Sequence, residues 1–89
     1  MRCKITATAF RPKFAKVNFI HPKDSDSPGF VREALAFPCY FDNNEKITVG
    51  DNDFRYALAP GHNVNVVWSK KLNCFVVRFC DDDFDPLAM

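Results

Sequence analysis

The sequence predicts a mostly β domain of the α+β type: a small antiparallel β-meander or partly closed barrel with one short helix. Apolar and polar residues alternate along most of the chain, which is the period of a strand with one buried face. Short segments rich in Asn, Asp, Pro and Gly separate these runs, as turns do. Ten phenylalanines supply large core side chains, and 89 residues is the size of a single domain, 1–89.

The clearest element is a hairpin over Asn63–Cys80. With the turn at Lys71 and Leu72, the large side chains of both strands gather on one face. A slip of one residue would turn that face to water, so the register is strongly specified. The expected pairs are Ser69 with Cys74, Trp68 with Phe75, Val66 with Val77 and Val64 with Phe79.

Residues 1–20 predict a second, basic β-hairpin around a three-residue loop, Arg11–Lys13. Its expected inward pairs are Ile5 with Phe19, Ala7 with Val17 and Ala9 with Ala15. Its outward face then holds three cations and an aromatic pair, namely Arg2, Lys4, Lys16, Phe10 and Phe14.

The one helix is expected in the middle of the chain. Ser27 can cap a helix that has Pro28 at its first position, which favours a helix over 28–37. A strand over Phe30–Phe37 is the alternative. Residues 39–80 then form an antiparallel meander, with Phe41 opposite Ile47, Val49 opposite Phe54, Ile47 facing Tyr56 and Leu58 opposite Val64. Residues 81–89 form an acidic tail.

Several classes of protein are not expected from this composition. No apolar run has the length of a signal peptide or of a membrane span, which predicts a cytoplasmic protein with free thiols and no membrane partner. The four Cys and two His match no usual zinc pattern, and the four Asp of 81–85 lack the spacing of a calcium loop. No catalytic dyad or phosphate-binding loop is evident. We therefore expect no metal, no cofactor and no enzyme activity.

The hypothesis that the sequence favours is a small binding protein that acts by protein–protein interaction. Val67 and Val76 project from the outer face of the last hairpin, near Arg78, and form a candidate contact surface. The alternative is a nucleic-acid-binding β domain. Residues 1–23 hold six Lys or Arg and no acid, and the basic hairpin would use the cations for phosphates and the aromatic rings for bases. The oligomeric state is left open.

Two short stretches resemble known proteins. The segment CKITATAF, Cys3–Phe10, resembles the start of some small prophage-encoded proteins, which implies a phage-type inhibitor or regulator of a host or defence complex. It covers eight residues of ordinary strand sequence. The stretch Leu58–Phe79 resembles small SH3-like barrels, and fold alone would not decide function.

Overall fold

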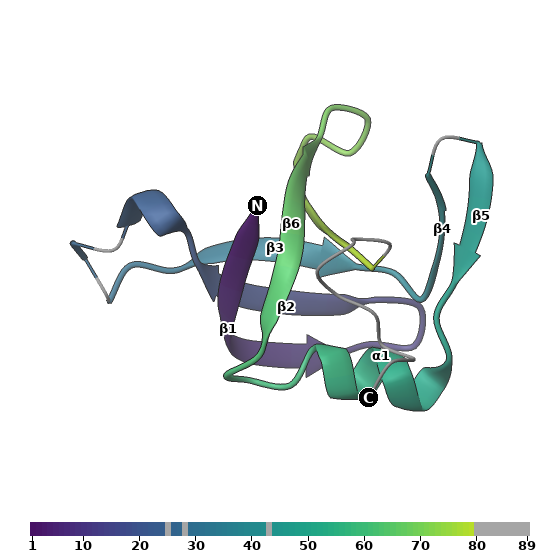
Figure 1. The fold of residues 1–89 in the computed structure, drawn as a ribbon, viewed down its shortest axis with the longest axis horizontal. Coiled ribbons are helices and arrows are strands. Elements are labelled where there is room, and N and C mark those ends of the chain that lie inside the picture. The colour runs from purple at the N-terminus through teal and green to yellow at the C-terminus, as the bar shows by residue number, and fades with distance from the viewer. Residues whose placement is uncertain (25, 28, 43, 80–89) are drawn as a thin grey trace.

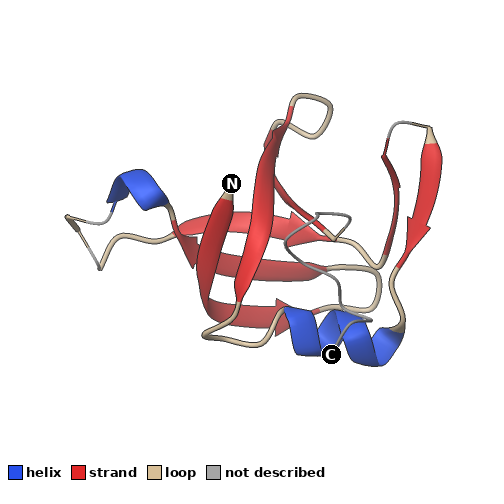
Figure 2. Cartoon of the chain, viewed as in Figure 1, coloured by secondary structure: helices blue, strands red, loops and turns tan. Residues whose placement is uncertain are grey.

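The computed structural model describes residues 1–89 with the exception of 25, 28, 43 and 80–89, so the predicted acidic tail and Cys80 lie outside the described residues. The fold is mostly β with one short α-helix, which confirms the predicted class. Figure 1 labels the elements and Figure 2 shows the strands in red. The elements are β1 (Arg2–Phe10), β2 (Ala15–Ile20), a 3-10 turn (Pro22–Asp24), β3 (Arg32–Ala36), β4 (Cys39–Asp42), β5 (Glu45–Thr48), α1 (Asp51–Ala57), β6 (Asn63–Ser69) and β7 (Cys74–Arg78).

Five strands close into a barrel in the order β1-β2-β3-β7-β6, and β1 completes it by pairing with both β2 and β6. All neighbouring pairs are antiparallel except β3 and β7, which are parallel. This order, with a helix before the fourth barrel strand, is that of the OB-fold, a five-stranded Greek-key barrel. The expected antiparallel meander and SH3-like arrangement are therefore corrected, because β7 pairs with β6 and also, in parallel, with β3.

The first hairpin forms, but its register changes half-way. Ile5 pairs with Phe19 as predicted, and then a β-bulge lies between Ile5 and Ala7. Beyond the bulge Thr8 pairs with Val17, so the predicted pair of Ala7 with Val17 is wrong by one residue. Ala9 likewise pairs with Lys16, and not with Ala15. A bulge bends and twists a strand, which helps one long strand to serve two neighbours in a closed barrel.

The helix is in a different place from the predicted one. The helix over 28–37 is wrong, since Arg32–Ala36 forms β3, which agrees with the strand alternative. Residues 51–57 form α1 instead, with Gly50 as its N-cap. Asp51 and Asp53 lie in its first turn, where a carboxylate interacts favourably with the positive end of the helix dipole. Figure 1 shows α1 across the end of the barrel where β1 ends.

The meander over 39–80 is also corrected. Only β4 and β5 pair in its first half, as a two-stranded sheet separate from the barrel. Ile47 faces Tyr40 in this hairpin, and Phe41 faces Lys46. The predicted pairs of Val49 with Phe54, Ile47 with Tyr56 and Leu58 with Val64 do not form, because α1 replaces the strand they required. In Figure 1 the hairpin projects beside the barrel.

The last hairpin has the predicted register. Ser69 pairs with Cys74, Trp68 with Phe75 and Val66 with Val77. Trp68 is nevertheless 52% exposed, although its pattern predicted a core residue. It lies near the end of β6, where its ring packs edge-on against Phe75 with centroids 5.0 Å apart.

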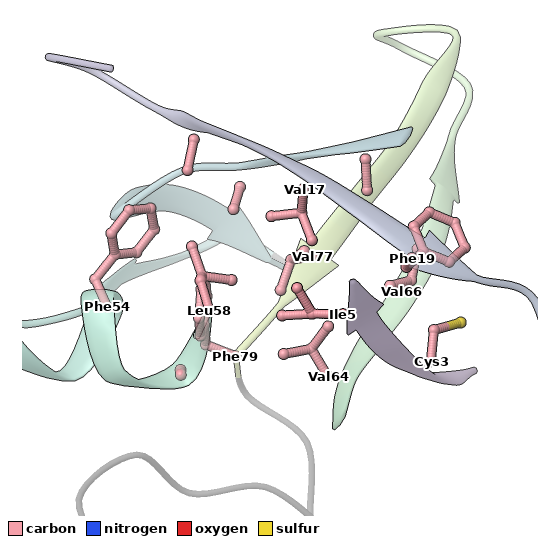
Figure 3. Packing of buried hydrophobic residues seen from close by; sticks show 14 of the residues in the cluster. Cys3, Ile5, Val17, Phe19, Phe54, Leu58, Val64, Val66, Val77 and Phe79 are labelled. Carbon is pink, nitrogen blue, oxygen red and sulfur yellow. The ribbon is translucent and has the colours of Figure 1, made fainter. Parts of the chain in front are cut away.

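The core fills the barrel, and α1 contributes side chains to it. Phe19, Ile5, Leu58 and Val64 are among its fully buried members. Figure 3 shows Phe54 and Leu58 extending from the helical segment toward the barrel side chains. The buried positions of β2 and of the first half of β1 alternate with more exposed ones, so these strands have an inner and an outer face. The outer face is what remains for binding.

An ion pair ties the loop after β2 to the start of β3. Arg32 Nε donates to Asp24 Oδ2 at 2.8 Å, and this hydrogen bond lowers the pKa of the Asp24 carboxyl below its usual 3.8. A carboxyl whose pKa is lower in the folded chain than in the unfolded chain stabilises the fold at pH values above its unfolded pKa. This stabilisation is lost as the pH falls through its folded pKa.

We expect Asp24→Asn to be less stable than the native chain at neutral pH, with the difference shrinking in acid as the pH falls below 3.8 and through the lowered pKa of Asp24. Unfolding midpoints of the two proteins at neutral pH and in acid measure this. A difference of equal size under both conditions would show that charge pairing is not the cause.

Candidate functional site

A groove lies between the barrel and the β4–β5 hairpin, with a volume of about 390 Å³. Ligand sites commonly have volumes of about 300–1,000 Å³. Three segments contribute its walls: the outer faces of β6 and β7, the turn between them, and β4 with the residues before it. The described residues that line it are Phe37, Tyr40, Phe41, Val67, Ser69, Lys71, Leu72, Val76, Val77 and Arg78.

The barrel wall of the groove is set by strand register. Val67 and Val76 are a direct cross-strand pair of β6 and β7, so their side chains leave the same outer face. Leu35 of β3 pairs with Val76, and Lys16 of β2 pairs with Leu35. Val67, Val76 and Leu35 therefore form an apolar row across the outer face of the barrel, and Lys16 is the next residue along that row.

The opposite wall belongs to β4. The Tyr40 hydroxyl accepts a hydrogen bond of 2.8 Å from the Phe79 N–H, just after β7, and the two rings pack with centroids 6.3 Å apart. These contacts join the small sheet to the barrel. Phe41, the next residue, also lines the groove and is 75% exposed, a large fraction for a phenylalanine.

The turn between β6 and β7 forms the third side. The Leu72 N–H donates to Ser69 Oγ at 3.1 Å, and Asn73 takes a left-handed conformation with φ 55° before β7 begins. This turn places Leu72, which is 49% exposed, beside Lys71 at the rim. The charged side chains among the described lining residues are those of Lys71 and Arg78, and both are cations.

The structure brings together three of the eight residues that the sequence singled out. Val67, Val76 and Arg78 all line the groove. The sequence did not indicate Phe41, which the meander placed on a buried face, or Leu72. The signal for Leu72 was available, because an apolar residue within the polar turn Lys70–Asn73 has no core to face.

The other five predicted residues do not form one site. Arg2, Lys4 and Lys16 are exposed on the outer faces of β1 and β2. The bulge turns Phe10 toward α1, where it packs edge-on against Phe54 at 6.2 Å and under the Arg55 guanidinium at 4.9 Å. Phe10 is therefore not available for base stacking, which corrects the predicted outward aromatic pair.

Phe14 has Phe37 as its aromatic neighbour, which differs from the outward pair with Phe10 and agrees with the alternative that Phe14 packs within the fold. Its ring packs against Phe37, with centroids 6.3 Å apart. It is half-buried and lies in the turn between β1 and β2.

Other chemistry finds little support in the described part of the chain. No group of three or more His, Cys, Asp or Glu there could hold a metal ion. None of its helices has the length and apolar character needed to cross a membrane. Cys3, Cys39 and Cys74 are free thiols, and burial raises the pKa of Cys3, which keeps that thiol protonated and unreactive.

Comparisons of the chain with protein-family models, with curated proteins and with solved structures find no match. The function is therefore argued from the geometry of the groove.

Proposed function

We propose that this protein binds a protein partner in the groove between the barrel and the β4–β5 hairpin. The observation that supports this most is the exposed Phe41 ring on one wall, opposite the Val67 and Val76 side chains on the other. Apolar side chains on both walls of an open groove favour an apolar anchor from a partner. Lys71 at the same groove favours a partner that supplies a carboxylate as well.

Such a protein acts by occupying a surface of a larger complex, as an inhibitor or regulator, and needs no catalytic group. A phage-type inhibitor is the form that the opening residues suggest. The proposal places the protein in the cytoplasm, where Cys3, Cys39 and Cys74 would stay reduced.

The test is affinity capture by the tagged full chain from a lysate of the organism that encodes it, with and without nuclease. The native chain is compared with Val76→Asp and with the double variant Lys4→Glu, Lys16→Glu. The proposal expects a stoichiometric protein that survives nuclease, is lost with Val76→Asp and is retained with the double variant. Capture that is equal with all three chains would contradict it.

Nucleic-acid binding is a second candidate because of the barrel topology. OB-fold barrels bind oligonucleotides and oligosaccharides on the face of their second and third strands. Here that face presents Lys16, Asn18, Glu33 and Leu35, with Lys4 on the adjacent β1. The carboxylate of Glu33, next to Asn18 in the sheet, weakens the attraction for phosphate, and the net charge of +1 is low for a nucleic-acid-binding domain.

The two candidates predict opposite results for Lys4→Glu, Lys16→Glu. If the groove is the site, partner affinity changes by less than about threefold. Lys16 lies two strands from Val76, a separation of about 10 Å, and charges further apart than about 8 Å are largely screened at physiological salt.

If nucleic acid is the ligand, the same variant loses binding and the native affinity falls steeply with salt. Fluorescence anisotropy with a labelled single-stranded oligonucleotide, at two salt concentrations, measures both effects.

A further inference from the structure

The free edge of β4 follows from the hydrogen bond at the base of its hairpin. The Val49 N–H donates to the Pro38 carbonyl at 2.7 Å, so the pair just before β4 is hydrogen-bonded. Hydrogen-bonded and non-hydrogen-bonded pairs alternate along an antiparallel ladder. Phe41 is three positions further along, so its backbone N–H and C=O point away from β5. The same holds for Cys39, which is one position along.

This free edge borders the groove. Tyr40 and Phe41 of β4 line it, and no residue of β5 is among its described lining. Figure 1 shows β4 on the barrel side of the hairpin and β5 on the far side. In the barrel each strand has two neighbours, whereas β4 and β5 have only each other in the described sheet, so each keeps one edge without a strand partner.

The charges around the groove are mainly positive. Lys46 pairs with Phe41 across the hairpin, so both side chains leave the same face. Lys70 and Lys71 lie in the exposed turn at the other side of the groove. Glu45 is a carboxylate at the hairpin tip, paired there with Asp42. Three lysines, Lys46, Lys70 and Lys71, therefore lie on the two sides of the groove and favour a bound segment with carboxylates.

We infer that the partner contributes an extended acidic segment, which adds to the free edge of β4 as a third strand of the small sheet. This inference rests on the proposed function, because it states how the groove is filled. Backbone hydrogen bonds to Phe41 and Cys39 supply register, as in other complexes formed by strand addition. Alternate side chains of the segment point to the apolar row of Val67 and Val76, and its carboxylates lie near Lys71.

The first test is selection of 12-residue peptides from a random display library on the full chain. We expect selected peptides that combine Asp or Glu with aromatic or aliphatic residues. They should bind the native chain at least about 30-fold more tightly than Val76→Asp, since a buried anchor contributes that much. Peptides that are basic, or that bind Val76→Asp equally well, would overturn the inference and with it the groove as the site.

The second test separates the mode of binding from the site. Phe41→Ala removes the ring and keeps the backbone N–H, whereas Phe41→Pro removes both. Because that N–H points away from β5, proline there removes no bond of the β4–β5 ladder. We expect Phe41→Pro to bind a selected peptide about fivefold more weakly than Phe41→Ala. Equal affinities would overturn strand addition and leave the groove as the site.

Chemically modified peptides test strand addition without a change in the protein. A selected peptide is synthesised with N-methyl amides at its odd positions or at its even positions. An added strand bonds β4 through one alternate set only. We therefore expect one methylated form to lose binding and the other to keep it within about threefold; equal losses would overturn the mode.

The chain's own acidic residues are the competing occupant. Asp81, Asp82 and Asp83 lie outside the described residues and have the chemistry that the groove favours. A full chain with all three replaced by asparagine is put through the same selection. Peptides obtained equally from both chains support a partner segment. Peptides obtained only from the triple variant would assign the groove to the chain's own residues and overturn the inference.

Discussion

Replacing Phe19 with alanine is expected to lower the free energy of unfolding by about 3–5 kcal/mol. Phe19 is fully buried on β2, opposite Ile5 of β1, and its ring packs edge-on against Phe75 with centroids 5.5 Å apart. The truncation leaves a cavity in the barrel that closed strands cannot collapse around. A domain of this size has a stability of about 4–13 kcal/mol, so the loss is a large part of the total.

Trp68→Ala is the matched control, because Trp68 also packs against Phe75 but is half-exposed at the end of its strand. We expect it to cost about half as much, roughly 2 kcal/mol. Urea unfolding of the two variants and the native chain measures both effects. A loss for Trp68→Ala as large as that for Phe19→Ala would show that the tryptophan is buried and that the barrel end is closed.

Val76→Asp is expected to weaken partner binding by at least about 30-fold, which is the effect of removing an interface hot spot. The carboxylate lies in the middle of the apolar row formed by Val67, Val76 and Leu35, where an anchor side chain would have to desolvate it. Because Val76 faces outward and is half-buried, its replacement should cost only about 1 kcal/mol of stability.

A second variant distinguishes loss of the binding surface from misfolding of Val76→Asp. Phe41→Ala removes a ring that is 75% exposed, so the fold loses little, but it takes away the opposite wall of the groove. Titration of the captured partner against the native chain and both variants gives the affinities. Full affinity in both variants, with thermal midpoints near that of the native chain, would exclude the groove.

The sequence predicted the hairpin of β6 and β7 correctly because two alternating runs and a short turn leave one register that buries an apolar face. It did not predict the bulge in β1. Thr6 and Ala7 fit a regular strand equally well, and the bulge is set by the need of β1 to pair with both β2 and β6.

The region around Phe54 shows a second limit. Phe54, Tyr56 and Leu58 alternate as a strand would, while Phe54, Ala57 and Leu58 recur with the spacing of a helix. Seven residues are too few for the period alone to decide. Closure of the barrel decides here, because Phe54, Ala57 and Leu58 are all buried when the segment is helical.

The candidate site was predicted only on the barrel side. Val67 and Val76 were found because the hairpin register alone places them outward. Phe41 could not be found this way, since its exposure depends on where the β4–β5 hairpin lies relative to the barrel. No local pattern in the sequence encodes that arrangement.

The most direct test of the groove is amide hydrogen exchange of the full chain, alone and with the captured partner. We predict slower exchange on binding at β4, at β7 and in the turn at Leu72, with the amides of β1 unchanged. Slower exchange confined to β1 and β2 would contradict the groove and move the site to the face that holds Lys4 and Lys16.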